Sequence, residues 1–228
     1  MPRIPRGHLE RGCFHVLNRG NQRQTLFHGP TDFARFLELL TEAQSHFEVG
    51  LWSYCLMGNH WHLVVEVDKM VELSGWMHWI TNRHVRATQR ERRIHGGGHV
   101  YQGRYKSFPI QDEVYLYDVM RYVEANPVRA GLTQRGRDWM WSSLSPLPIQ
   151  LGLLTVERPR LRPWTRNEAW EAAVDQPQEE NRLGSLRHSV QRGTPQGDGD
   201  WVEHYALTNG LQSTLRPPGR PRKARVGA

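Results

Sequence analysis

The order of apolar and polar positions along the 228-residue chain predicts a mixed α+β domain in its first two thirds. Residues 13–19, 49–57, about 60–65 and 106–111 are apolar or alternating runs next to turn residues, which is typical of strands. Apolar residues recur with helical spacing after a candidate N-cap, Asp32, over residues 32–47, and helices are also predicted over 71–92 and 113–126. The Gly-Asn pair at 58–59 predicts a hairpin between the second and third strands.

The resulting order is strand, helix, hairpin, helix, strand, helix. It predicts a ferredoxin-like α+β fold in which an antiparallel sheet carries its helices on one face. We expect residues 1–146 to form this domain. From residue 147 to residue 228 prolines, arginines and polar residues dominate, with a short helical signal over 201–211. We therefore expect an irregular, basic and partly disordered C-terminal extension.

The charge balance points to an acidic polymer as partner. The chain carries a formal charge of +7 and its pI is about 9.8, which favours nucleic acid over an anionic membrane. The sequence has no apolar run of membrane-spanning length and no secretory leader, so we expect a cytoplasmic, nucleoid-associated protein. Cys13 and Cys55 lie in apolar segments and are expected to be reduced core residues.

The candidate chemistry begins at two histidines on one predicted strand. His60 and His62 are separated by Trp61, and alternate side chains of a strand share a face, so the two imidazoles form half a site for a divalent metal. On the last predicted helix Tyr122 and Asn126 are four residues apart and share a face. They offer a phenolic nucleophile and an amide oxygen. Tyr115 lies two helical turns before Tyr122, so periodicity leaves both tyrosines as candidates.

Cations cluster in two segments that suit DNA. The glycine-rich stretch 96–107 interleaves Arg104 and Lys106 with Tyr101 and Tyr105, a composition that fits stacking and phosphate contacts along a single strand. The tail at 215–223 contains Gly-Arg-Pro-Arg. Such a tail is either a solvated charged end or a minor-groove contact, and both readings stay open.

Taken together, these pieces resemble the REP-associated tyrosine transposases, which are single-tyrosine members of the HUH group. The resemblance covers roughly residues 1 to 145 and is carried by collinear motifs: His15-Val16 with Arg19-Gly20-Asn21, the segment 56–63 around the two histidines, Gln102 to Ser107, Tyr122 to Leu132, and Trp141-Ser142-Ser143.

The resemblance implies that Tyr122 is the nucleophile, that His60 and His62 are metal ligands, and that Asn126 is a third ligand for Mg²⁺ or Mn²⁺. It implies a single-stranded DNA endonuclease or strand transferase that acts on hairpin-forming repetitive DNA through a covalent phosphotyrosine. We expect a monomer or a homodimer. The expected DNA contacts are the basic and amide side chains Arg19, Asn21, Arg23, Arg104, Lys106, Arg129, Arg220 and Arg222.

Two other functions compete with this one. A hairpin DNA or RNA binder derived from a transposase would bind without a metal and without the phenol of Tyr122. A metallohydrolase acting on a small phosphoester is disfavoured by the basic charge, and would form no tyrosine adduct.

Overall fold

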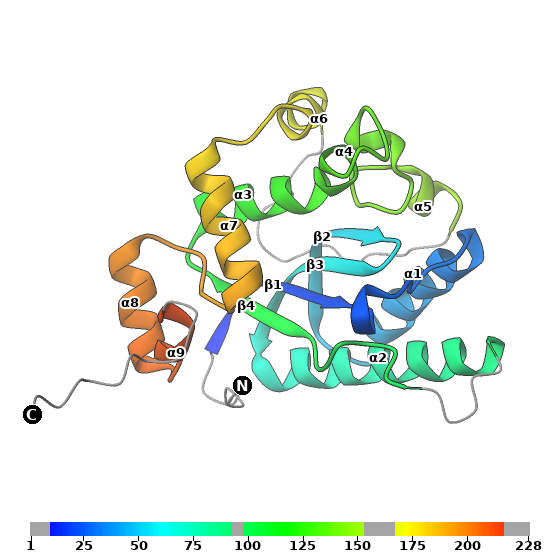
Figure 1. The fold of residues 1–228 in the computed structure, drawn as a ribbon, viewed down its shortest axis with the longest axis horizontal. Helices are drawn as coiled ribbons and strands as arrows, with labels where there is room; N and C mark the ends of the chain where they lie inside the picture. The colour runs from blue at the N-terminus through cyan, green and yellow to red at the C-terminus, as the bar shows by residue number, and fades with distance from the viewer. Residues whose placement is uncertain (1–9, 93–97, 153–166, 217–228) are drawn as a thin grey trace, which may run out of the picture.

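A four-stranded antiparallel sheet forms the centre of the molecule (Figure 1). The computed structural model describes residues 10–92, 98–152 and 167–216. In order across the sheet the strands are β2 (Val49–Met57), β3 (His60–Lys69), β1 (Glu10–Arg19) and β4 (Lys106–Ile110). The predicted antiparallel α+β architecture is confirmed. β1 begins at Glu10, three residues before the expected start at residue 13.

Two long helices cover one face of the sheet. They are α1 (Pro30–Gln44) and α2 (Met70–Glu91). Their apolar faces meet the strand residues of one parity in a core that contains Phe36, Trp61 and Trp76, all fully buried. The expected N-cap of the first helix is wrong: Gly29 occupies that position, and the Asp32 carboxylate accepts a hydrogen bond from the backbone N–H of His28.

The other face of the sheet carries α3 (Glu113–Glu124), which packs mainly on β2 and β3. The prediction that all helices lie on one face is therefore wrong. Strand β2 is buried at nearly every position, and a strand with two apolar faces needs cover on both. The second core includes Cys55, Val64 and Val119. Both cysteines are free, as predicted.

The buried carboxylate of Glu124 connects α3 to its surroundings. Oε1 accepts hydrogen bonds from the hydroxyls of Ser53 at 3.0 Å and Ser143 at 2.5 Å, and Oε2 accepts from the indole N–H of Trp170 at 2.6 Å. These donors lie on β2, on the loop before residue 147 and on α6 (Glu168–Asp175). Since Glu124 is fully buried, these hydrogen bonds replace contacts with water that its oxygens would otherwise make.

The C-terminal segment adds helices that pack against α3. α6 and α7 (Glu180–Arg192) both contact α3, with Trp170, Leu183 and Leu186 in the second core. After α7, Gln196 pairs with β4 through backbone hydrogen bonds to Pro109 and Gln111. The helical signal near residue 201 corresponds to α8 (Gly199–Thr208). The sequence does not predict α6 or α7, and the proposed division at residue 146 stays a prediction.

Short elements complete the described chain: η1 (Asn21–Arg23), α4 (Asn126–Arg129), η2 (Gly136–Asp138), α5 (Leu147–Gln150) and α9 (Gln212–Leu215). Helix α4 follows α3 after one residue, Ala125, which itself has helical backbone angles. The two helices therefore nearly continue each other past Pro127, where the sequence predicted an end.

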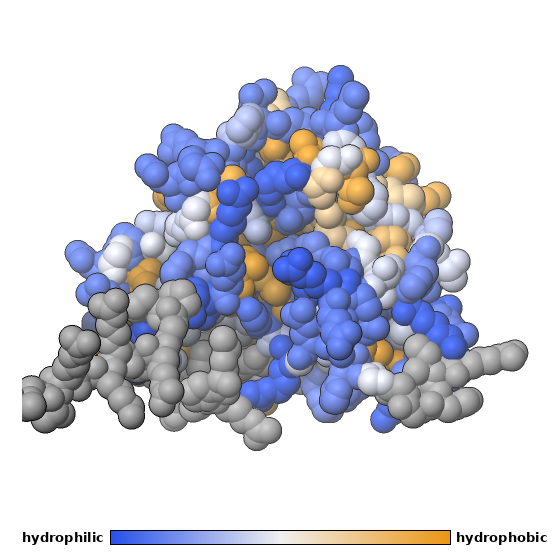
Figure 2. All heavy atoms as spheres, viewed as in Figure 1, coloured by the Kyte–Doolittle hydropathy of each residue, from blue (hydrophilic) through white to orange (hydrophobic). Residues whose placement is uncertain are grey.

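The face in Figure 2 is dominated by hydrophilic side chains, with apolar side chains gathered in the region of α4 and α5. The exposed large hydrophobic residues of that region are Leu132, Leu147, Ile149 and Leu151. Within the described residues, none of the helices is both long and apolar enough to span a bilayer.

Replacing Glu124 by methionine should lower the free energy of unfolding by about 2–4 kcal/mol, because the buried donors of Ser53 and Trp170 and the half-buried hydroxyl of Ser143 lose this acceptor. Urea denaturation measures the effect. The matched control is Glu113→Met at the exposed start of the same helix, for which we expect a cost below about 1 kcal/mol. Equal costs for the two variants would contradict this role of Glu124.

Candidate active site

The two histidines of β3 lie side by side on the face of the sheet that α3 covers. Their ring centroids are 5.1 Å apart and the ring planes are nearly perpendicular, at 84°. Trp61 points into the opposite core against Phe36. The predicted sharing of a face by His60 and His62 is therefore confirmed.

Burial keeps both imidazoles neutral. It lowers the pKa of His60 to about 4, with a smaller contribution from the charge of Arg19. Burial also lowers the pKa of His62 well below its ordinary value, and His15, His60 and two arginines act in the same direction. A metal ligand must present an unprotonated nitrogen, so the rings are ready to bind a cation at neutral pH.

Hydrogen bonds fix which nitrogen each ring presents. Nδ1 of His60 lies 2.7 Å from Oδ1 of Asn59. Nδ1 of His62 lies 2.9 Å from Nε2 of His15 on the neighbouring strand β1. No hydrogen bond among the described residues engages the Nε2 of either His60 or His62. Two Nε2 atoms are thus left to face a ligand.

Of the two candidate tyrosines, Tyr122 is the one next to the histidines. Its ring centroid lies 6.0 Å from that of His62 and 6.1 Å from that of His15, edge to face in both cases. Tyr115 lies at the other end of α3, where burial and the charges of Asp198 and Asp112 raise the pKa of its phenol. The packing of α3 therefore separates two residues that helical periodicity leaves equivalent.

Asn126 lies one turn beyond Tyr122. Its Nδ2 donates to the backbone carbonyls of Tyr122 and Val123, at 3.2 and 3.1 Å. Since the amide nitrogen is engaged with the helix, the amide oxygen is the atom left for another partner.

The donor set fits a divalent cation with mixed nitrogen and oxygen ligands. His60 and His62 supply two neutral nitrogens, and the side-chain oxygen of Asn126 is the third donor that the sequence indicates. Within the described ranges, no group of three or more His, Cys, Asp or Glu side chains could hold a metal ion. A metal site here therefore depends on the amide or on groups from outside the chain.

Arg129 is placed against the candidate nucleophile. Its guanidinium carbon lies 4.2 Å from the centre of the Tyr122 ring, and one of its nitrogens donates to the Tyr122 carbonyl oxygen at 2.5 Å. Desolvation lowers the pKa of Arg129, while Tyr122 raises it through charge and a side-chain hydrogen bond. The guanidinium of Arg129 therefore lies beside the phenol, which gains negative charge as a tyrosine nucleophile loses its proton.

Several residues that the sequence selects for DNA contact gather around the end of β1. Arg19 is paired with His60 across the sheet, and Asn21 and Arg23 form the turn that follows. The loop that carries Arg104 lies beside them, because Asn18 donates to the carbonyl oxygen of Gly103. A group of cations thus borders the histidines.

The remaining selected cations have other surroundings. Lys106 donates to the backbone carbonyls of Val190 and Gln191, at 3.1 and 3.3 Å, and so caps the C-terminal end of α7. Burial lowers the pKa of its ammonium group. Arg220 and Arg222 lie outside the described residues.

The expectation that Tyr101 and Tyr105 stack on DNA bases is wrong. Both rings are buried. The hydroxyl of Tyr101 lies 2.7 Å from Nδ1 of His84 and accepts a hydrogen bond from the indole N–H of Trp61. These aromatic side chains fill the core under the glycine-rich loop.

Sequence reasoning missed His15 and Asn59 as parts of the site. Each contacts the Nδ1 of a candidate ligand. Asn59 directly precedes His60, so its position was a usable signal. His15 is 47 residues from His62 and comes next to it only through the pairing of β1 with β3.

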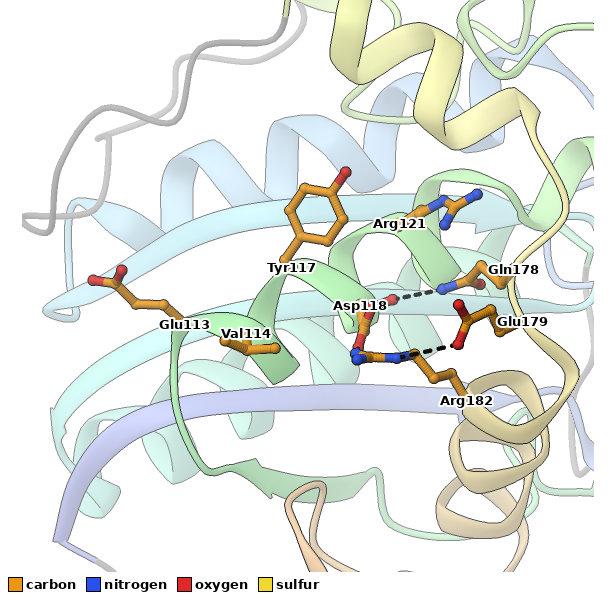
Figure 3. A pocket seen from close by; sticks show the side chains of 8 residues that line it. All are labelled: Glu113, Val114, Tyr117, Asp118, Arg121, Gln178, Glu179 and Arg182. Carbon is orange, nitrogen blue, oxygen red and sulfur yellow. Dashed lines mark hydrogen bonds and ion pairs between the residues drawn. The ribbon is translucent and has the colours of Figure 1, made fainter.

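A separate pocket of about 500 Å³ lies between α3 and the start of α7 (Figure 3). Neither the histidines nor Tyr122 line it. Its Arg182 is paired with Asp118 and Glu179, and Arg121 donates to backbone carbonyls before α7. The pair of Arg182 with Asp118 therefore joins α7 to α3, and Arg121 joins α3 to the segment before α7.

Comparison with known proteins agrees with the geometry. Residues 9–126 match the family model of IS200-like transposases. No protein with a curated description matches the chain.

The structure of a REP-associated tyrosine transposase bound to a REP hairpin aligns with a TM-score of 0.53 and 17% identity. The alignment covers 74% of this chain and 98% of that one. A protein from Deinococcus radiodurans R1 described as a transposase aligns with a TM-score of 0.36 and 17% identity, over 54% of this chain and 96% of that one.

The family model spans the β1 strand, both histidines and Tyr122, which is more than half of the chain, and the fold is that of a REP-associated tyrosine transposase. The chain belongs to the family of IS200-like transposases.

Proposed function

We propose that this transposase cleaves single-stranded DNA beside a hairpin by using Tyr122 as the nucleophile. The observation that carries the proposal is the position of Tyr122, whose ring lies about equally far from His62 and His15, at 6.0 and 6.1 Å, with Arg129 over its face. A nucleophile, a cation and a metal-ligating pair are the groups that phosphodiester transesterification requires.

In the proposed step the phenolic oxygen of Tyr122 attacks the phosphorus of a phosphodiester. A bond forms between the tyrosine oxygen and phosphorus, and the bond from phosphorus to one sugar oxygen breaks. The phenolic proton passes to water, and the leaving sugar oxygen takes up a proton from water. The products are a covalent phosphotyrosine and a free hydroxyl end, which conserve the bond energy for rejoining. Arg129 stabilises the negative charge that develops at the reacting groups.

His60, His62 and Asn126 would hold Mg²⁺ or Mn²⁺, which supplies Lewis-acid stabilisation of the phosphate oxygens when bound. The residues themselves contribute rigidity. The histidines are fixed by strand β3 and by hydrogen bonds to Asn59 and His15, and Asn126 is held by the end of the tyrosine helix.

The substrate class is supported by charge and by the fold. Arg19, Arg23 and Arg104 lie around the end of β1 next to His60, where they would contact DNA phosphates. The REP-associated transposase of the same fold is bound to a REP hairpin. We infer that a hairpin with a single-stranded flank is the substrate, and that a chain of net charge +7 binds it in a salt-dependent manner.

Tyr122→Phe should abolish cleavage of a labelled hairpin oligonucleotide in the presence of Mn²⁺, with a loss of at least about 1,000-fold, because phenylalanine has no nucleophilic oxygen. Denaturing gels measure both the cleaved product and the protein–DNA adduct. Tyr115→Phe is the matched control on the same helix and should retain activity within about twofold. Both variants should bind the hairpin as the wild type does.

Two results would contradict this assignment. Adduct formation that survives Tyr122→Phe and disappears in Tyr115→Phe would transfer the role to Tyr115. Hairpin binding by the wild type without any adduct, with several hairpins and both cations, would favour a binding protein derived from a transposase.

Mn²⁺ affinity should change less than about twofold between pH 7.5 and 6, because the lowered pKa values of His60 and His62 leave both rings neutral over that range. Two histidines with ordinary pKa values near 6.5 would lose about tenfold or more in affinity over that interval, since protons would compete with the metal. Electron paramagnetic resonance of free Mn²⁺ measures the affinity.

His60→Ala should weaken this Mn²⁺ binding at least about tenfold, whereas His78→Ala, at an exposed position of α2, should leave it unchanged. Unaltered binding in His60→Ala would remove the histidine pair from the metal site.

A further inference from the structure

His15 is a buried polar residue that takes no part in the bond changes of the proposed reaction. It is fully buried in the middle of β1, opposite Phe108 on β4. Its ring stacks on His62 with centroids 5.1 Å apart and meets the edge of the Tyr122 ring at 6.1 Å. It therefore contacts both a candidate ligand and the candidate nucleophile.

The hydrogen bond of His15 determines the orientation of His62. Nε2 of His15 lies 2.9 Å from Nδ1 of His62, and this contact leaves Nε2 of His62 on the opposite side of the ring. For Nε2 of His62 to bind a cation, the proton of that ring must be on Nδ1. Nδ1–H of His62 then donates the hydrogen bond, and the unprotonated Nε2 of His15 accepts it.

The second ring nitrogen of His15 does not determine which of the two histidines donates their shared hydrogen bond. Nδ1 of His15 is buried and has no hydrogen-bond partner in the described structure. This atom stays unpaired whether His15 donates to His62 or accepts from it. Neither arrangement satisfies it, so this atom does not determine which ring donates. A cation bound at Nε2 of His62 would require His62 to be the donor.

We propose that His15 is a positioning residue, whose Nε2 accepts a hydrogen bond from Nδ1 of His62 and so directs Nε2 of His62 to the metal. The inference rests on the proposed function, because it assumes that His62 is a ligand. Outer-shell partners of ligating histidines fix the ring orientation and the tautomer, and their loss typically weakens metal binding about 10–100-fold.

Three variants separate this role from packing. His15→Phe keeps an aromatic ring but has no acceptor, and it should weaken Mn²⁺ binding about 10–100-fold. His15→Gln places an amide oxygen within reach of Nδ1 of His62 and should recover most of the affinity. Phe108→Leu disturbs the packing on the other side of His15 and should stay within about twofold of the wild type.

The readout is Mn²⁺ affinity of the full chain without DNA, followed by paramagnetic resonance. In the wild-type protein saturated with Mg²⁺, the imidazole ¹⁵N resonances of His62 should show the proton on Nδ1. This second measurement requires no substitution, so it holds even where a variant fails to fold.

Four results would overturn the inference. The first is an equal Mn²⁺ affinity of His15→Phe and wild type, and the second is an equal loss of affinity in His15→Phe and His15→Gln. The third is a loss of affinity in Phe108→Leu as large as that in His15→Phe. The fourth is a proton on Nε2 of His62 in the Mg²⁺ form. If the wild type binds no Mn²⁺ at all, the metal site of the proposed function fails, and the role of His15 fails with it. Binding by the wild type that is indifferent to His15 overturns the role of His15 alone.

Discussion

The structure depends most on how the end of α3 is fixed to the sheet, and the buried carboxylate of Glu124 makes that connection. It joins β2, the serine loop before residue 147 and α6 through three hydrogen bonds, two residues after Tyr122. A helix that carries a nucleophile must not slide relative to the strand that carries the ligands, since small misplacements of reacting groups reduce rates strongly. Glu124 supplies polar, directional contacts beside the apolar second core, while Asp118 and Arg121 form the polar contacts of α3 with α7 and the segment before it.

A metal site also requires unprotonated histidines. The burial that holds these side chains in place also keeps them neutral. His15, His60 and His62 lie under α3, and in each case burial is the largest cause of the lowered pKa. Arg19 and Arg129 lie at the border of this cluster, where they add positive charge and contribute to the lowered pKa of His62. The arrangement suits an anionic substrate and a cation that bind together.

The sequence predicts the sheet and the histidine pair well, because both rest on local alternation. The bounds of β2 agree with the prediction to the residue, and Trp61 and His62 take opposite faces as the strand period requires. Local patterns in the sequence do not predict contacts between distant segments. The hydrogen bond from Trp170 to Glu124 spans 46 residues, and the buried hydroxyl of Tyr101 is paired with His84, which lies on another element. Helix α7 escaped prediction since its apolar stripe is short, with Leu183 and Leu186 among charged residues.

The most direct test of the account is to map the residue that becomes linked to DNA. Trypsin cleaves after Arg121, so Tyr122 lies in the peptide 122–129 and Tyr115 lies in the peptide 107–121. Mass spectrometry of the adduct formed with a hairpin oligonucleotide and Mn²⁺ should find the nucleotide on peptide 122–129. A modified peptide 107–121, or the absence of any modified peptide from a protein that binds the hairpin, would contradict the account.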